Sequence, residues 1–169
     1  MLLSYLLKTF RLVMTAIILI LFVRTFVIEP GRVNGLSMEP TYFDDQLFFL
    51  NKFQLIFSKP ERGQIIQAKM PGSEKLVMKR IIGLPGETVH IRDNSVYITT
   101  AGGTTSRLDE PYLGSDVATQ TKDMKPRDYP TLRADEYFIL GDNRRKSADS
   151  RDFGAVKREE IIGLVISST

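Results

Sequence analysis

The chain has 169 residues, 43% of them hydrophobic and 25% charged, which fits one folded domain with room for an appendage. It has no cysteine and one histidine, His90, so disulfides, thiol nucleophiles and metal sites built from several histidines are excluded. Three of the 23 basic residues and one of the 20 acidic residues precede residue 30, so the rest of the chain has a net charge of +1. Nucleic acid is not an expected partner, because phosphate binding needs positive charge concentrated on one surface.

The N-terminal segment is long and apolar. Residues 10–28 contain only two charged side chains, Arg11 and Arg24, and as a helix they would span roughly 28 Å, close to the ~30 Å hydrocarbon core of a bilayer. A buried core helix is disfavoured because apolar residues surround the helix on all sides, and a cleaved signal peptide because no small-residue cleavage site follows. We therefore predict a single-pass anchor in the cell membrane. Lys8 and Arg11 near its start favour a cytoplasmic N-terminus at residues 1–9 and an extracytoplasmic domain at residues 30–169.

Beyond residue 29 the pattern predicts strands. Seven β-rich runs are separated by turn sequences, and Thr88–Thr99 has the pattern of a hairpin that turns at Asp93-Asn94. The predicted strands are Gln46–Lys52, Gly63–Lys69, Lys75–Ile82, Thr88–Arg92, Ser95–Thr99, Glu136–Leu140 and Ile161–Ser167. No amphipathic helix of 10–15 residues separates them, which argues against an α/β fold. The composition of residues 101–134, rich in Gly, Thr, Asp and Pro, predicts a long excursion over the surface with a small strand pair of its own. The expected fold class is mainly β.

Ser37 is the first candidate for chemistry. It lies between Gly35 and Pro40 in a polar turn, Val33–Thr41, that begins five residues past the predicted anchor. Most serines in such surroundings are simple turn residues. The turn does not match the hydrolase pattern G-x-S-x-G, which would need glycine at position 39, nor S-x-x-K, because position 40 is proline.

Lys79 and the segment 141–154 are the other two candidates. Strand alternation places Lys79 on one face with Val77 and Ile81, where burial can bring a lysine pKa down to ~7–8, the range that a general base needs. The alternative is a lysine on a solvated face. The charged segment 141–154 is either a solvated loop or a buried network that stiffens a catalytic loop. With one histidine in the chain, a Ser/Lys pair is the economical way to activate a hydroxyl.

Four motifs follow one another over nearly the whole chain. They are G-L-S-M-E-P-T at 35–41, M-K-R-I-I-G-L-P-G-E at 78–87, L-D-E-P-Y at 108–112 and G-D-N-R-x-x-S-x-D-S-R-x-F-G at 141–154. By these motifs and the apolar segment before them, the sequence resembles the bacterial type I signal (leader) peptidases, which are membrane-anchored Ser/Lys endopeptidases. The resemblance implies a coiled, Greek-key-like antiparallel β domain with no cofactor and no metal. It also implies acyl-enzyme cleavage of secretory preproteins, with small side chains one and three residues before the cut.

The resemblance assigns roles to individual positions. They are nucleophile for Ser37, general base for Lys79, orientation of the lysine amine for Ser147, and support of the catalytic loop for Asp142, Asp149 and Arg151, the last two as an ion pair. Gly35 stands where some members have an oxyanion-hole serine, as in many Gram-positive relatives. The hole is then expected to use the Ser37 N–H and a second, unassigned donor. The family's R-G-D is Arg62-Gly63-Gln64 here, so an acidic turn residue is missing.

The expected partners are secretory preproteins, the lipid bilayer and the translocation machinery. Met38 and Phe43, close to Ser37, are candidates for contact with the bilayer surface, against the alternative of core packing. Two other functions stay open. One is a degenerate relative that binds exported chains without cutting them, and the other is a specialised peptidase for pili or a conjugation system.

Overall fold

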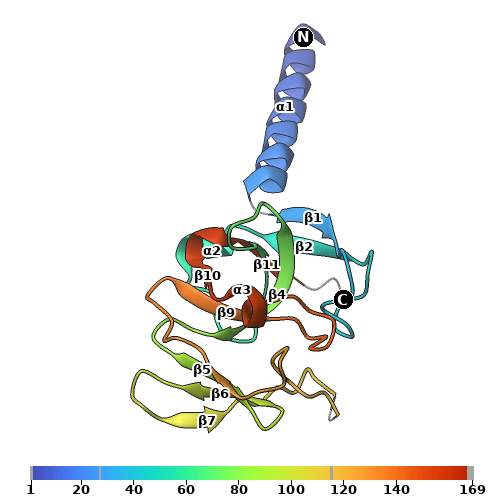
Figure 1. Cartoon of the computed structure of the whole chain (residues 1–169). Coiled ribbons are helices and arrows are strands. Elements are labelled where there is room, and N and C mark those ends of the chain that lie inside the picture. Colours follow the sequence, from blue (N-terminus) through green and yellow to red (C-terminus); the bar gives the residue numbers. More distant parts are fainter. Residues whose placement is uncertain (1, 27, 115, 167–169) are drawn as a thin grey trace.

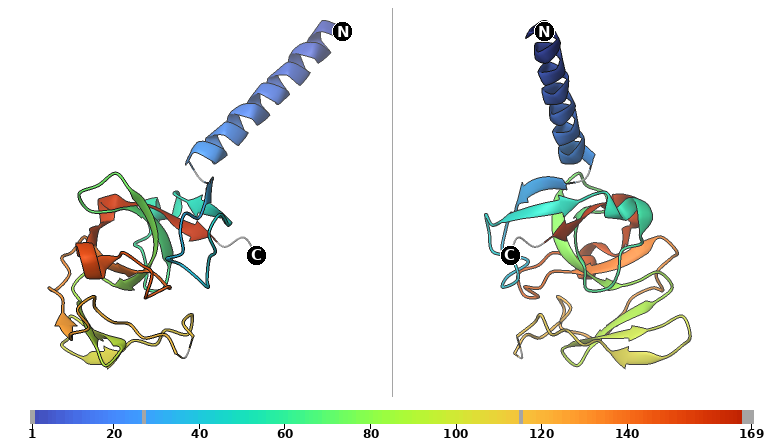
Figure 2. Two further views of the ribbon diagram at one scale, coloured as in Figure 1. Left: turned by 45° about the vertical axis from the view of Figure 1, so that its right-hand side comes forward. Right: turned by 180° about the vertical axis from the view of Figure 1, so that it is seen from behind.

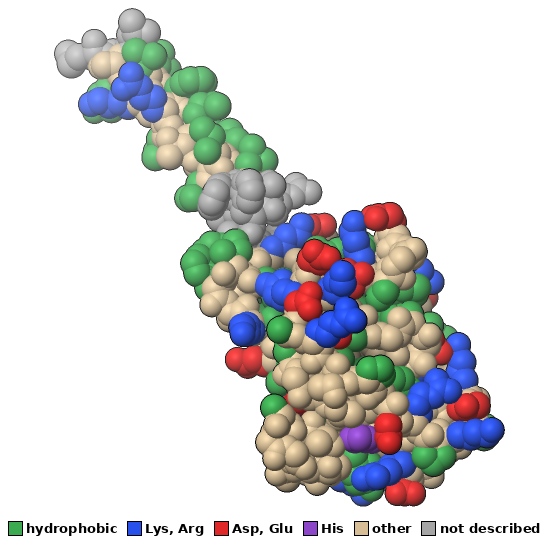
Figure 3. Space-filling view, turned by 60° about the vertical axis from the view of Figure 1, so that its left-hand side comes forward, with side chains coloured by type: hydrophobic (Ala, Val, Ile, Leu, Met, Phe, Trp, Pro, Cys, Tyr) green, Lys and Arg blue, Asp and Glu red, His purple; other side chains and the backbone are tan. Residues whose placement is uncertain are grey.

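A long N-terminal helix, α1 (Leu2–Phe26), projects from a β-rich body in the computed structural model, which describes residues 2–26, 28–114 and 116–166 (Figure 1). Within these residues, α1 is the one helix long and apolar enough to cross a membrane, over Ser4–Leu21, and none of that window is buried. Its exposed surface carries mostly apolar side chains, whereas the body carries many charges of both signs (Figure 3). Packing of this helix into the core is therefore excluded. The helix begins eight residues before the predicted span, so Lys8 lies inside it.

The larger sheet has seven strands, and every neighbouring pair in it is antiparallel. Its order is β1 (Ile28–Arg32), β2 (Leu47–Asn51), β11 (Ile161–Ile166), β3 (Ile65–Lys69), β4 (Leu76–Gly83), β9 (Glu136–Leu140) and β10 (Val156–Lys157). The last strand, β11, inserts between β2 and β3, and the sheet curls around the core (Figure 2). This confirms the predicted mainly β fold.

A second, four-stranded sheet lies at the end of the body opposite α1 (Figures 1 and 2). Its order is β7 (Thr105–Arg107), β6 (Ser95–Thr99), β5 (Thr88–Arg92) and β8 (Arg127–Asp128). Asp93 and Asn94 both have positive φ, 50° and 59°, as a two-residue hairpin turn of type I′ requires, and the predicted hairpin is confirmed. The strand pair predicted inside the excursion is wrong, because β7 and β8 join opposite edges of this hairpin instead of each other.

All seven predicted strands are present, and the elements that were not predicted are short or irregular. They include α2 (Gln54–Phe57), α3 (Ser150–Phe153) and a 3₁₀ turn at Arg158–Glu160. Strand β1 contains Pro30 and Gly31, which argue against a strand in sequence, but β1 is an edge strand, where proline costs no internal hydrogen bond. Glycine is needed at position 31, because a Cβ there would lie 2.5 Å from the ring of Phe48.

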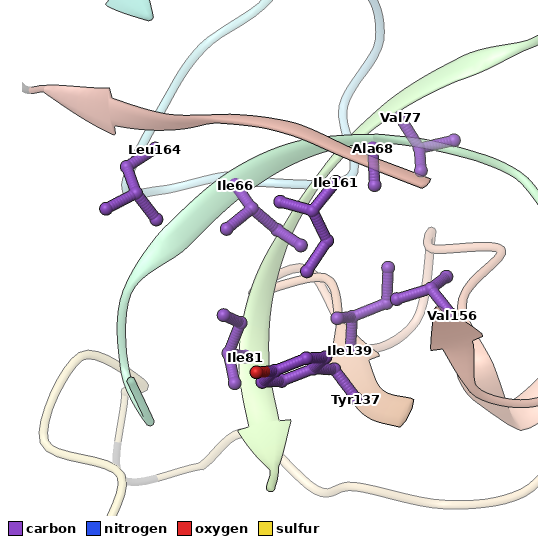
Figure 4. Packing of buried hydrophobic residues seen from close by; sticks show 9 residues of the cluster. All are labelled: Ile66, Ala68, Val77, Ile81, Tyr137, Ile139, Val156, Ile161 and Leu164. Atoms are coloured by element: carbon purple, nitrogen blue, oxygen red, sulfur yellow. The ribbon is translucent and has the colours of Figure 1, made fainter. Parts of the chain in front are cut away.

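Strand β4 is buried on both faces, which decides the environment of Lys79. Val77 and Ile81, which alternate with Lys79, belong to one core cluster, while Met78 and Ile82 belong to two others. Figure 4 shows the first cluster, which consists of Ile66, Ala68, Val77, Ile81, Tyr137, Ile139, Val156, Ile161 and Leu164. Because both faces of β4 are buried, the predicted alternative of a solvent-facing Lys79 does not hold.

Candidate active site

Ser37 and Lys79, 42 residues apart in sequence, are in direct contact. The Lys79 Nζ donates a hydrogen bond to Ser37 Oγ at 2.7 Å and another to the carbonyl of Met78 at 2.8 Å. The lysine is only 3% exposed, whereas Ser37 is half-buried. The lysine is therefore sheltered from water, while Ser37 keeps part of its surface exposed.

The turn that carries Ser37 is held at both ends. Gly35 has a φ of +96°, which favours glycine, and its N–H donates to Asp44 Oδ1 at 2.7 Å. The carbonyl of Ser37 accepts the N–H of Asn143 at 3.0 Å, which ties the turn to the segment 141–154. Met38 is fully buried in a core cluster, so of the two alternatives for this residue core packing holds and bilayer contact does not. Phe43, by contrast, is 56% exposed.

Burial lowers the pKa of Lys79 from 10.5 to about 8, because the charged ammonium is poorly hydrated inside the protein and the neutral amine is favoured. The nearby carboxylate of Asp149 opposes this effect and raises the pKa, as does Asp142 to a smaller extent. A lysine with this pKa is partly neutral under mildly alkaline conditions. It then has a lone pair that can accept a proton from the hydroxyl it contacts.

Asp149 is fully buried and organises the loop between β9 and α3. Its carboxylate accepts hydrogen bonds from the backbone N–H groups of Gly141 at 3.0 Å and Arg151 at 3.2 Å, and caps α3. The guanidinium of Arg151 donates to both carboxylate oxygens at 2.8 Å, so the expected ion pair is present. The segment 141–154 is a paired network with a buried centre, and a fully solvated loop is excluded.

Asp142 forms the second ion pair of this loop, with a partner that the sequence did not reveal. Arg80, the residue after Lys79, donates to both oxygens of Asp142 at 2.9 and 2.6 Å. Thr41 Oγ1 donates to the same carboxylate at 2.5 Å. Asp142 therefore joins the turn of Ser37, the strand of Lys79 and the segment 141–154 at one buried point.

Ser147 lies beside Gly141 and the carbonyl of Ser37, but it makes no hydrogen bond to the amine of Lys79. Its hydroxyl is buried and makes no hydrogen bond within the residues that the structure describes. A Cβ built on Gly141 would collide with Ser147 Oγ and would lie 2.5 Å from the carbonyl oxygen of Ser37, which places all three residues together. Orientation of the amine by Ser147 stays a prediction.

The L-D-E-P-Y motif packs the excursion against the catalytic loop. Glu110 forms a bidentate ion pair with the buried Arg144, at 2.5 and 3.1 Å, and Arg144 donates to the carbonyl of Gly141 at 3.0 Å. The ring of Tyr112 lies 3.9 Å from the guanidinium of Arg80. Burial raises the pKa of Tyr112, so its hydroxyl stays protonated and donates to Glu110. The motif marked these positions in the sequence, but nothing in it named their partners.

Gln64, which stands where the family's motif has an acidic residue, supplies a hydrogen-bond acceptor to its own turn. Gln64 Oε1 accepts the N–H of Glu61 at 3.0 Å, an acceptor role that a carboxylate could also fill. The carbonyl of Gly63 accepts a hydrogen bond from Arg80 at 2.7 Å, so this turn also supports the ion pair at Asp142.

Neither His90 nor a metal cluster contributes to the site. His90 lies in the second sheet, where its two ring nitrogens contact Asp128 and Thr99, each at 2.7 Å. Within the described part of the chain, no group of three or more His, Cys, Asp or Glu side chains is placed to hold a metal ion. The titratable side chain that contacts the Ser37 hydroxyl is that of Lys79.

An accessible serine beside a buried lysine of lowered pKa, on a curled antiparallel β domain, is the geometry of serine hydrolases that use lysine in place of histidine. Comparison with known proteins places the chain in a family of peptidases. Residues 6–168 match the family described as signal peptidase, peptidase S26. A signal peptidase I of Bacillus amyloliquefaciens is 36% identical over 161 residues, which cover 90% of this chain and 82% of that protein.

Two further relatives show the same likeness. Signal peptidase I P of Bacillus subtilis subsp. natto is 34% identical over 163 residues, covering 91% of this chain and 83% of the relative. The solved structure of a signal peptidase I from Enterococcus faecalis V583 is 34% identical, with a TM-score of 0.51 over 63% of this chain and 97% of that one. The chain therefore belongs to the signal peptidase family, whose substrates are exported preproteins.

Proposed function

We propose that this chain cuts exported preproteins after small residues by acyl-enzyme chemistry, with Ser37 as nucleophile and Lys79 as general base. The observation that carries the proposal is the 2.7 Å contact between a half-buried hydroxyl and a buried amine whose pKa is lowered to about 8. Once the amine has lost its proton, the same distance lets it accept the proton of the hydroxyl.

The reaction follows from these two groups. Ser37 Oγ attacks the carbonyl carbon of the residue before the cut while its proton moves to Lys79 Nζ. The tetrahedral intermediate collapses, the C–N bond breaks, and Lys79 gives its proton to the leaving amine. Water then attacks the ester, passing a proton to Lys79. The ester C–O bond breaks as Ser37 Oγ recovers that proton.

The backbone at Ser37 supplies one donor for the oxyanion. The N–H of Ser37 donates no hydrogen bond within the described residues, so it is available for the charge that develops on the substrate carbonyl. The N–H of Gly35 is occupied by Asp44, so Gly35 shapes the turn and does not supply the second donor in this arrangement.

The free edge of β4 can bind the substrate residues that precede the cut. Leu76 to Lys79 pair with β3 on one side, whereas pairing with β9 on the other side begins only at Arg80. Within the described residues this leaves a free strand edge that ends at the catalytic amine. An extended substrate can pair with such an edge, which presents its carbonyl to Ser37.

We further propose that α1 anchors the body on the outer side of the membrane, with the N-terminus in the cytoplasm. The apolar surface of α1 and the basic residues in its first half support this orientation. The site would then meet preproteins as they leave the translocation machinery. External protease added to spheroplasts is expected to degrade the body and spare α1, whereas protection of residues 30–169 would contradict the topology.

The mechanism is tested with purified protein in detergent and a panel of preproteins, by sequencing the new N-termini. Ser37→Ala and Lys79→Arg are each expected to lose on the order of 10³-fold or more of the activity, and the double variant little more, because the two residues act as one unit. Arginine keeps the charge but cannot lose its proton at working pH. The matched control is His90→Gln, which is expected to keep both the activity and the pH profile.

The outcomes separate the candidate functions. Cleavage after small residues across the panel supports a general signal peptidase, and cleavage of a single substrate indicates a specialised relative. Binding without cleavage would indicate the degenerate relative. Substantial activity in Lys79→Arg would contradict the Ser/Lys mechanism whatever the substrate range.

A further inference from the structure

A cavity of about 460 Å³ opens beside the active site, between the turn of Ser37, the excursion and the catalytic loop. Its volume is in the range of sites that bind small ligands or side chains. We call it the loop cavity and define it by Pro40, Phe43, Leu113, Val117, Asn143 and Arg145. No step of the reaction proposed above uses it.

One part of the wall of the loop cavity suits an apolar group. Pro40, Phe43, Leu113 and Val117 contribute apolar side chains, and Phe43 is 56% exposed although aromatic side chains usually find cover. Five charged residues also line the cavity. Asp142 and Arg144 are buried and paired, with Arg80 and Glu110 respectively, whereas Asp116 and Arg145 are exposed and Glu39 is half-buried. The charges of the two buried residues are therefore compensated by their partners, and the other three charges are at least partly open to solvent.

The loop cavity lies next to Ser37. Asn143, one of its lining residues, donates its N–H to the carbonyl of Ser37 at 3.0 Å. Pro40 follows Ser37 by three residues, a stretch of chain that reaches at most roughly 11 Å. An extended substrate covers that distance within three or four residues, so the cavity is within reach of a bound substrate.

The arrangement of the body indicates which end of the substrate reaches the cavity. The wall formed by Leu113 and Val117 belongs to the excursion, at the end of the body opposite α1, whereas β1 and β2 lie next to α1 (Figures 1 and 2). The residues before the cut are continuous with an apolar signal segment that resides in the same bilayer as α1. The residues after the cut therefore lead away from α1 and toward the loop cavity.

We propose that the loop cavity binds an apolar side chain located one to four residues after the cut. The proposal rests on the proposed peptidase function and adds a preference for the mature part of the preprotein. It also gives the excursion a role, because two of the cavity's apolar walls come from it.

The test uses the full-length protein in detergent and internally quenched peptides that share the same residues before the cut. Four alanines follow the cut, and leucine or aspartate replaces each of them in turn. At one of the four positions, kcat/KM is expected to be about 10-fold higher for leucine than for aspartate, the discrimination typical of one apolar pocket. A flat profile at all four positions would overturn the proposal.

Variants then locate the preference. For Val117→Asp, the ratio of kcat/KM for leucine to kcat/KM for aspartate at that position is expected to fall close to one. This variant is also expected to prefer lysine there, a gain that an unfolded enzyme could not show. Met124→Asp is the matched control, because Met124 is a largely exposed apolar residue of the excursion that does not line the loop cavity. A leucine preference that survives Val117→Asp would place the subsite elsewhere and overturn the assignment.

The two proposals fail in different ways. If the wild-type protein cleaves none of the peptides, the peptidase function itself is contradicted. If it cleaves them all at one rate, the peptidase function stands and the loop cavity has no part in substrate selection.

Discussion

Burying Lys79 should make the folded protein less stable than it would be with an apolar residue at this position. The lysine is 3% exposed and its pKa is lowered from 10.5 to about 8, mainly because the ammonium is removed from water. Lys79→Met keeps a long, flexible side chain of similar reach and removes the charge. We expect this variant to be inactive and more stable than the wild type at neutral pH.

The size and sign of the effect follow from proton linkage. A base whose pKa is lowered by folding destabilises the folded state at low pH, and the penalty fades as the pH rises from the folded toward the unfolded pKa. The lowering from 10.5 to about 8 corresponds to a penalty of about 3 kcal/mol at pH 7. By pH 10 the penalty should have fallen by about 2 to 3 kcal/mol.

The assay is urea unfolding of the full-length protein in detergent, followed by near-ultraviolet circular dichroism at pH 7, 8, 9 and 10. The quantity of interest is the difference in the free energy of unfolding between Lys79→Met and the wild type. Packing changes and lost hydrogen bonds contribute a nearly constant offset, so the pH dependence isolates the charge. Lys59→Met, at an exposed position, is the matched control. A difference that stays constant, or grows with pH, would refute the reasoning.

Three further predictions concern the loop around the pair. Gly141→Ala places a Cβ 2.5 Å from the carbonyl oxygen of Ser37, so kcat should fall at least about 10-fold in peptide assays, and an unchanged kcat would contradict the tight packing. Glu110→Gln unpairs the buried Arg144 and should lower the unfolding free energy by about 3 kcal/mol in urea titrations. Asp149→Asn removes the charge that most raises the pKa of the catalytic amine, so the acidic limb of kcat/KM should move to lower pH. A limb that moves to higher pH would contradict that sign.

Local chemistry explains which parts of the fold were predictable. The hairpin of β5 and β6 follows from its alternating residues and from Asp93-Asn94, which tolerate positive φ. Strands β7, β8 and β10 have three, two and two residues, too few to show a period in sequence. They form because neighbouring edges are available to them, which is a property of the assembled sheets.

The site was predictable only in part, for a related reason. Ser37 and Lys79 could be found from their surroundings and their motifs, but each considered alone favoured an ordinary structural role. The partners of Asp142 are 62 and 101 residues away in sequence, at Arg80 and Thr41. Nothing in the local sequence indicates that Arg80, next to Lys79, points to the opposite face of the strand and binds Asp142. Pairings of this kind depend on the order of the strands.

Asp149 and Asp142, which hold the segment 141–154 in place, also affect the pKa of Lys79. Burial alone would lower the pKa of Lys79 further, and Asp149 and Asp142 raise it again through their charge. Each carboxylate is held by an arginine, Arg151 or Arg80, whose positive charge weakens the field that the carboxylate exerts on the amine. Unpaired carboxylates at these positions would stabilise the ammonium and make the lysine a poorer base near neutral pH. Arg151 and Arg80 thus fix the loop in place. By the same ion pairs they limit the rise in the pKa of Lys79, so that the amine can lose its proton more readily.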